Sequence, residues 1–120
     1  YGAAYTEALN YKDKHVFVVG GANSAAQGAL YLSRFASKVT VLIRGHEPTA
    51  SKYLVDAMYA NDKIEILLNT DLLDVKGTTT LEQITVKNTK RNETQTFDAA
   101  AMFVFIGVRP RPIDSVRNLL

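Results

Sequence analysis

The feature that most constrains this sequence is a glycine pair set between an apolar strand and a helical segment. Residues 18–27 read V-V-G-G-A-N-S-A-A-Q, and the first of them belong to a β-branched run, His15–Val19, that is typical of a buried parallel strand. After the glycines, alanine, leucine and tyrosine recur at helical spacing over residues 24–36. A strand, a tight glycine turn and a helix in this order predict a unit that binds a dinucleotide at the start of its helix.

The residues of the turn match the dinucleotide fingerprint with one departure. Gly20 would permit the tight turn, and Ala25 would let the helix and the strand pack closely. The helix, capped by Asn23 or Ser24, would present free amide groups and the positive end of its dipole to a pyrophosphate. Ala22 stands where the fingerprint has its second glycine, and its methyl group would weaken or reposition a dinucleotide. The alternative is a Rossmann-like turn that binds nothing.

Arg44, which follows a second apolar strand predicted at 38–43, indicates which nucleotide would bind. Enzymes that prefer NAD have an acidic residue about 20 residues past the turn, where it holds the ribose 2′-hydroxyl. Here Arg44 lies 24 residues after Gly20, and the next acidic residue is Glu47. A guanidinium group suits a 2′-phosphate, so NADPH is favoured over NADH and FAD, the alternative being a solvated charge at a strand end. The neighbours close enough to assist with the phosphate are His46, Thr49, Ser51 and Lys52.

The remaining pattern predicts one α/β domain. A helix over 49–60 and a strand over 63–68 complete a βαβαβ order, which implies a parallel sheet with right-handed crossovers. Tyr31 and Tyr53 fall on the core-facing sides of the two helices. Apolar and polar residues then alternate, as in an antiparallel meander with one solvated face, and an apolar run returns as a buried strand. These last segments are 71–76, 81–87, 93–97 and Ala101–Ile106. The expected fold is therefore a Rossmann-like parallel sheet with helices on its faces and an antiparallel β-meander crossover.

Composition excludes several classes of function. The 120 residues contain no cysteine, which rules out disulfides, zinc–thiolate sites and thiol catalysis within the chain. The net charge is only +2, with scattered lysines and arginines, so neither nucleic acid nor a membrane surface is expected as a partner. No apolar run approaches the ~18 residues of a membrane span and no signal peptide is visible, so a cytoplasmic location is expected. The sequence also holds no metal-ligand cluster, Ser–His–acid spacing or paired carboxylates, so we predict no metal ligand and no catalytic residue.

The chain resembles the NADPH domain of the thioredoxin reductase-like, FAD-dependent pyridine nucleotide–disulfide oxidoreductases. The resemblance rests on V-V-G-G-A-N-S-A-A-Q-G-A-L-Y-L-S and K-V-T-V-L-I-R-G, which are similar to that group's glycine turn, helix and second strand, and on F-V-F-I-G-V-R-P near the end. It implies that the domain binds NADPH, which passes hydride to the flavin held by an FAD domain of the same polypeptide. The isolated chain is then expected to be inactive, and a homodimer is one expected assembly of the full-length enzyme.

The resemblance also implies roles for individual residues and limits for the domain. The pyrophosphate turn would consist of Gly20, Gly21, Asn23, Ser24 and Ala25, with Ala22 in place of the usual glycine. Arg44 would meet the 2′-phosphate, and Gly107 would allow close approach at the end of the last strand. The implied organisation is a linker from the FAD domain at 1–14, an NAD(P)H-binding domain at 15–110 and a return segment at 111–120.

Three departures from the family pattern leave the electron acceptor open. Ala22 replaces a glycine, and Gly45 and Thr49 stand where further arginines often follow Arg44. The C-x-x-C pair expected before the turn reads A-A-Y-T at residues 3–6, so electrons would not reach thioredoxin by the usual route. The alternatives are a ferredoxin/flavodoxin–NADP reductase-like enzyme, a non-catalytic Rossmann-like scaffold, and a thioredoxin reductase whose cysteines have been replaced.

Overall fold

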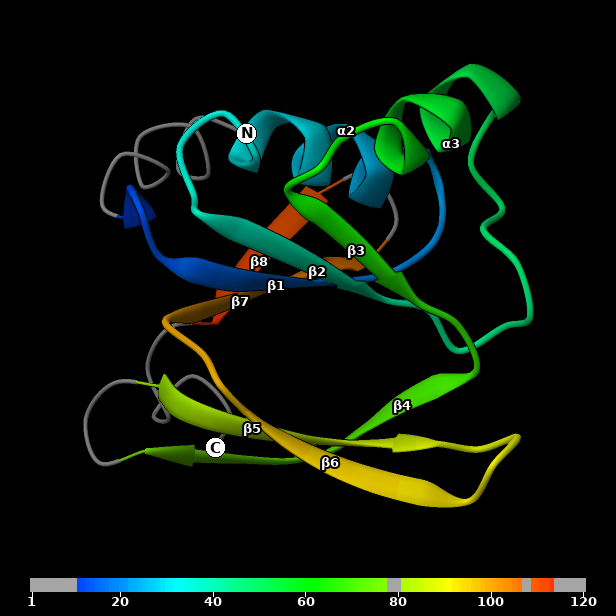
Figure 1. Cartoon of the computed structure of the whole chain (residues 1–120). Coiled ribbons are helices and arrows are strands. Elements are labelled where there is room, and N and C mark those ends of the chain that lie inside the picture. The colour runs from blue at the N-terminus through cyan, green and yellow to red at the C-terminus, as the bar shows by residue number, and fades with distance from the viewer. Residues whose placement is uncertain (1–10, 78–80, 107–108, 114–120) are drawn as a thin grey trace.

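The computed structural model describes residues 11–77, 81–106 and 109–113, and it confirms the expected α/β fold class (Figure 1). A five-stranded sheet has the order β3-β2-β1-β7-β8, and a three-stranded sheet has the order β4-β5-β6. The strands of the first sheet are β1 (His15–Val19), β2 (Lys38–Leu42), β3 (Ile64–Leu67), β7 (Ala101–Ile106) and β8 (Arg109–Ile113). Those of the second are β4 (Thr70–Gly77), β5 (Leu81–Asn88) and β6 (Glu93–Asp98).

Strand β1 lies in the middle of the larger sheet, between β2 and β7, and runs parallel to both. Val18 pairs with Val41 on one side and with Phe103 on the other. Strand β3 continues the parallel set beyond β2, whereas β8 pairs antiparallel with β7 and was not predicted from the sequence. The carboxyl ends of β1, β2 and β7 therefore lie at the same edge of the sheet. The glycine turn directly follows the end of β1.

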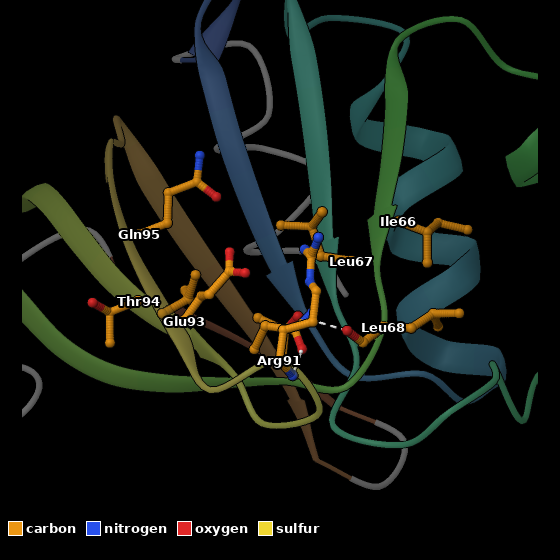
Figure 2. Close-up of a pocket in the computed structure, with 10 residues that line it drawn as sticks. Ile66, Leu67, Leu68, Arg91, Glu93, Thr94 and Gln95 are labelled. Atoms are coloured by element: carbon orange, nitrogen blue, oxygen red, sulfur yellow. Dashed lines mark hydrogen bonds between the residues drawn. The ribbon is translucent and has the colours of Figure 1, made fainter.

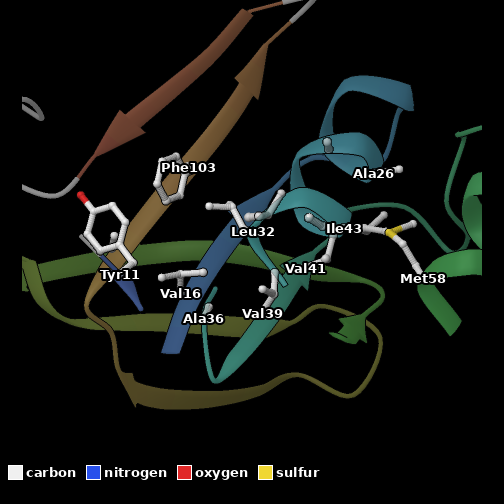
Figure 3. Packing of buried hydrophobic residues seen from close by; sticks show 14 of the residues in the cluster. Tyr11, Val16, Ala26, Leu32, Ala36, Val39, Val41, Ile43, Met58 and Phe103 are labelled. Carbon is white, nitrogen blue, oxygen red and sulfur yellow. The ribbon is translucent and has the colours of Figure 1, made fainter. Parts of the chain in front are cut away.

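Both helices, α2 (Asn23–Leu32) and α3 (Lys52–Tyr59), lie on one face of the larger sheet, and the meander covers the opposite face (Figure 1). This arrangement gives two cores, because neighbouring residues of a strand point to opposite faces. Val16, Val41 and Phe103 pack toward the helices, as Figure 3 shows. Phe17 and Leu42 are in the other core, toward the meander. Strands β1 and β2 and the first half of β7 are thus buried on both sides, as their apolar runs predict, whereas all residues of β3 are only partly buried.

The helices are shorter than the sequence predicts. Helix α2 ends at Leu32 instead of residue 36, because the segment after it bonds to the residues that precede β1: the carbonyl of Phe35 accepts from the amide of Asp13, and the amide of Ser37 donates to the carbonyl of Lys14 (2.9 Å each). Helix α3 begins at Lys52 instead of residue 49, because the amides of Thr49 and Ala50 both donate to the carbonyl of Gly21 (2.9 Å each). These bonds keep the approach to α3 attached to the glycine turn.

The prediction that Tyr53 faces the core is wrong. Its side chain is 70% exposed, and the buried positions of α3 are Leu54 and Met58, one helical turn apart. A helix of eight residues has room for only a narrow buried stripe, and Tyr53 lies about 100° away from Leu54 around the axis. Tyr31 of α2 does pack against the helix-facing core and is partly buried, as expected.

Candidate functional site

The glycine turn brings three elements into close contact. Gly20 has φ +138°, a conformation that other residues rarely adopt. A Cβ atom at this position would lie 3.1 Å from Ala25 Cβ in α2 and 3.3 Å from the carbonyl oxygen of Phe105 in β7. The first glycine and the small residue of the fingerprint therefore face each other, which is the packing that the sequence predicts for them.

The start of α2 lacks a side-chain cap, which corrects the prediction that Asn23 or Ser24 caps the helix. The N-cap residue is Ala22, and no side chain accepts a hydrogen bond there. The Asn23 side chain instead accepts a bond from the backbone amide of Ser51 (2.7 Å), and the first turn of α2 contains no acidic residue. Amide donors at a helix start, without a side-chain acceptor, suit an anion such as a pyrophosphate. The turn therefore fits a bound dinucleotide.

A groove of about 260 Å³ opens beside the glycine turn, at the carboxyl ends of β1 and β2. We call it the turn groove. Its lining residues are Val19, Gly20, Gly21, Leu42, Ile43, Arg44, Gly45, Glu47 and Thr49. Crevices at the carboxyl ends of parallel strands are where ligands of open α/β sheets bind. Four of the predicted residues, Gly20, Gly21, Arg44 and Thr49, thus lie together.

Arg44 has an ionic partner that the sequence did not reveal. Its Nε atom lies 2.7 Å from Oδ1 of Asp71, at the start of β4. The two residues are 27 positions apart in the chain, and no local pattern links them. The strand order was the only feature of the sequence that could have indicated this contact. Parallel strands β2 and β3 are neighbours, so the segments that follow them, with Arg44 and Asp71, lie at the same edge of the sheet.

The other residues proposed for the phosphate lie less centrally. Lys52 does not line the turn groove and pairs with Asp56 one turn along α3 (3.1 Å). His46 also lies outside the lining, with Nε2 3.8 Å from Oε1 of Glu47. Thr49 does line the groove, whereas Ser51 contributes the amide that Asn23 binds. Gly107 and the A-A-Y-T segment fall outside the described residues.

A larger groove, of about 520 Å³, lies between β3 and the meander and includes none of the predicted site residues (Figure 2). Figure 2 shows Arg91 near Leu67 and Leu68, with Glu93 on the adjoining strand. Its outer wall consists of exposed residues of the β5–β6 hairpin. We favour the smaller turn groove as the candidate site, because it is lined by a strand-end arginine and by the glycine turn that leads into a helix start without a side-chain cap.

His15, the first residue of β1, has a structural environment. Its Nε2 atom lies 2.7 Å from Oγ1 of the buried Thr40, and its ring stacks on Phe17 with centroids 4.4 Å apart. Burial, and then the nearby Lys38 ammonium, hold the pKa of His15 below its ordinary value of 6.5, while the Glu65 carboxylate acts in the opposite direction. The neutral imidazole is therefore favoured.

Within the described ranges, no group of three or more histidine and acidic side chains could hold a metal ion. No helix in those ranges is both long and apolar enough to span a membrane.

Comparison with known proteins identifies the family. Residues 3–117 match the family described as pyridine nucleotide-disulphide oxidoreductase. The chain belongs to this family. It is 38% identical over 100 residues to a thioredoxin reductase of Dictyostelium discoideum, covering 83% of this chain and 31% of that protein. The description of this family names an oxidoreductase, a pyridine nucleotide and a disulphide.

Solved structures of the family share the fold. Thioredoxin reductase from Streptococcus pyogenes superposes with a TM-score of 0.80 at 29% identity, over 84% of this chain and 33% of that one. The enzyme from Lactococcus lactis superposes with a TM-score of 0.82 at 25% identity, over 87% and 35%. The chain therefore spans about a third of the length of these relatives.

Proposed function

We propose that this chain is the NADPH-binding domain of a thioredoxin reductase-like flavoprotein. The observation that carries the proposal is the turn groove, which is lined by the glycine turn and the strand-end Arg44 and lies where the chain leads into the uncapped start of α2. The relatives named above support the enzyme class.

The turn groove and the adjoining start of α2 would bind different parts of the nucleotide. The first-turn amides of α2 would donate to the pyrophosphate, and the close packing of Gly20 against Ala25 keeps these amides near the end of β1. Arg44 would donate to the 2′-phosphate, with Thr49 beside it. NADPH supplies a hydride when bound. In the full-length protein the hydride would pass to the flavin of an FAD domain in the same polypeptide.

The proposed nucleotide-binding domain covers residues 15–110, with linkers to the FAD domain at 1–14 and 111–120. We also propose a cytoplasmic enzyme, with a homodimer as one assembly of the full-length protein. The chain itself contains no cysteine, which favours electron transfer from the flavin directly to an acceptor, as in a ferredoxin/flavodoxin–NADP reductase-like enzyme.

A second candidate function is a non-catalytic Rossmann-like scaffold. The existing ion pair between Arg44 and Asp71 favours it, because the guanidinium has a partner without any nucleotide. This candidate predicts that the chain binds neither NADPH nor NADH.

Titration of the purified chain with NADPH and with NADH separates these functions. We expect NADPH to bind more tightly, and Arg44→Ala to weaken NADPH binding by about 10- to 100-fold, since a charge-assisted hydrogen bond contributes about 1.5–3 kcal/mol. NADH binding should change far less. Arg91→Ala is the matched control, because it removes the same charge from the larger groove between β3 and the meander. Absence of binding to both nucleotides, or an Arg44→Ala variant that binds NADPH unchanged, would contradict the proposal.

A further inference from the structure

The guanidinium of Arg44 is held by a carboxylate at the place where a 2′-phosphate would bind. Its Nε atom lies 2.7 Å from Asp71 Oδ1, a distance typical of a charge-assisted hydrogen bond. The Arg44 side chain is 83% exposed, whereas that of Asp71 is only 34% exposed. Arg44 is thus the solvent-exposed member of the pair, and Asp71 is the more buried one.

The backbone fixes Asp71 in this position. The amide of Asn69 donates to the carbonyl of Gly45, and the amide of Thr70 donates to the carbonyl of Ile43 (2.9 Å each). These two bonds lie on either side of Arg44 in the sequence, so the start of β4 runs directly alongside it. Thr70 is itself buried, and its hydroxyl donates to the carbonyl of Leu68 (2.8 Å). Asp71 is therefore part of an ordered connection between the two sheets.

Arg44 also lies on the boundary between two grooves. One is the turn groove, and the other, of about 420 Å³, is lined by Arg44, Asp71 and neighbouring residues of β1, β2 and β4. The Arg44 guanidinium, which would bind the phosphate in the turn groove, already forms an ion pair with the Asp71 carboxylate in the second groove. A nucleotide with a 2′-phosphate must compete with Asp71 for it.

We infer that Asp71 is a specificity-determining residue that lowers the preference of the turn groove for NADPH over NADH. A 2′-phosphate would displace the carboxylate from Arg44 and would then lie near a like charge, which disfavours it. A 2′-hydroxyl meets no such repulsion and can donate a hydrogen bond to a carboxylate. In NAD-preferring proteins the acid follows the second strand directly, whereas in this chain the start of β4 supplies it. The inference rests on the proposed nucleotide-binding function.

The test is the ratio of the NADH and NADPH dissociation constants, measured by titration of the purified chain. The ratio cancels every contact that the two nucleotides share, including those at the glycine turn. Asp71→Asn keeps the size of the side chain and removes its charge, so we expect the ratio to rise about tenfold in favour of NADPH at low salt. The rise should shrink as salt increases, because the pair is exposed to solvent.

Two further variants make the result specific. Asp74→Asn removes the same charge from the same strand, at an exposed residue outside the groove, and should leave the ratio unchanged within about twofold. Glu47→Gln removes the acid that lines the turn groove. Because Glu47 contacts His46 and not Arg44, this variant should change the ratio less than Asp71→Asn does. Adenosine 2′,5′-bisphosphate and 5′-AMP, as smaller probes, should reproduce the change, since they differ only in the 2′-phosphate.

The outcomes separate this inference from the proposed function. If the wild-type chain binds the nucleotides and Asp71→Asn leaves the ratio unchanged, or if Glu47→Gln raises it more, the inference is wrong and the proposed function stands. If the folded chain binds neither nucleotide, both are wrong. Circular dichroism of each variant verifies that the fold is intact.

Discussion

Gly28 in the middle of helix α2 provides a test of how closely this helix packs on the sheet. A Cβ atom at this position would lie 2.8 and 2.9 Å from the Cε2 and Cε1 atoms of the Phe105 ring, and nearer still to Cζ. Phe105 is on β7, and its carbonyl oxygen borders the glycine turn. The ring thus occupies the space that a side chain at residue 28 would need.

We predict that Gly28→Ala destabilises the protein by about 1–2 kcal/mol, although the same change in an open helix stabilises it by about 1 kcal/mol. Three atoms of one ring would overlap the new methyl group, which places the cost near the top of the ~1–3 kcal/mol range for overpacking. The helix propensity of alanine then offsets about 1 kcal/mol of that cost.

Urea unfolding followed by far-ultraviolet circular dichroism measures this effect. With a slope of about 2 kcal/mol per molar urea, the midpoint should fall by about 0.5–1 M. Gln27→Ala, at the exposed neighbouring position, is the control and should change the free energy of unfolding by less than about 0.5 kcal/mol. The double variant Gly28→Ala/Phe105→Leu should be at least as stable as Phe105→Leu alone, because a shorter side chain leaves room for the methyl group. Stabilisation by Gly28→Ala in the wild-type background would refute the packing described here.

Two further predictions concern His15 and Asn23. The pKa of His15 is held below 6.5 in the folded state, so the unfolded chain binds more protons than the folded protein as the pH falls below 6.5. The free energy of unfolding should therefore decrease over this range. His15→Gln should remove the part of the decrease that comes from His15. Thermal unfolding of both proteins between about pH 5 and 8 measures it, and identical pH profiles would contradict the prediction. Asn23→Ala removes the bond to the Ser51 amide and should cost about 1 kcal/mol, measured by urea unfolding. Nucleotide affinity should also fall, because that bond joins the approach to α3 to the glycine turn. An unchanged midpoint of urea unfolding in Asn23→Ala would show that the bond contributes nothing to stability.

Much of the fold could be predicted from the sequence, because it depends on local patterns. The bounds of β1 and β7 agree with those predicted, since each is an uninterrupted apolar run with clear breaks on both sides. The three meander strands differ by a residue or so at their ends, because alternation identifies a strand better than its last residue. The helix ends were less accurate, since bonds to distant segments determine where α2 and α3 begin and end.

The candidate site was only partly predictable. The glycine turn could be located because each of its residues has a role that depends on its immediate neighbours. The cap of α2 could not be predicted, since Asn23 binds the amide of Ser51, 28 residues away. The assignment of individual residues to NADPH stays a prediction.

The sequence by itself determined that a buried strand leads through a tight glycine turn into a helix, and that Arg44 follows the next strand. These features arise from backbone conformation and apolar burial, which depend on short stretches of chain. Only the tertiary structure decided that Asp71 meets Arg44 and that the meander covers the face opposite both helices. Contacts of this kind depend on which strands lie side by side and in what register, and residues far apart in the sequence come together only when the whole sheet has formed.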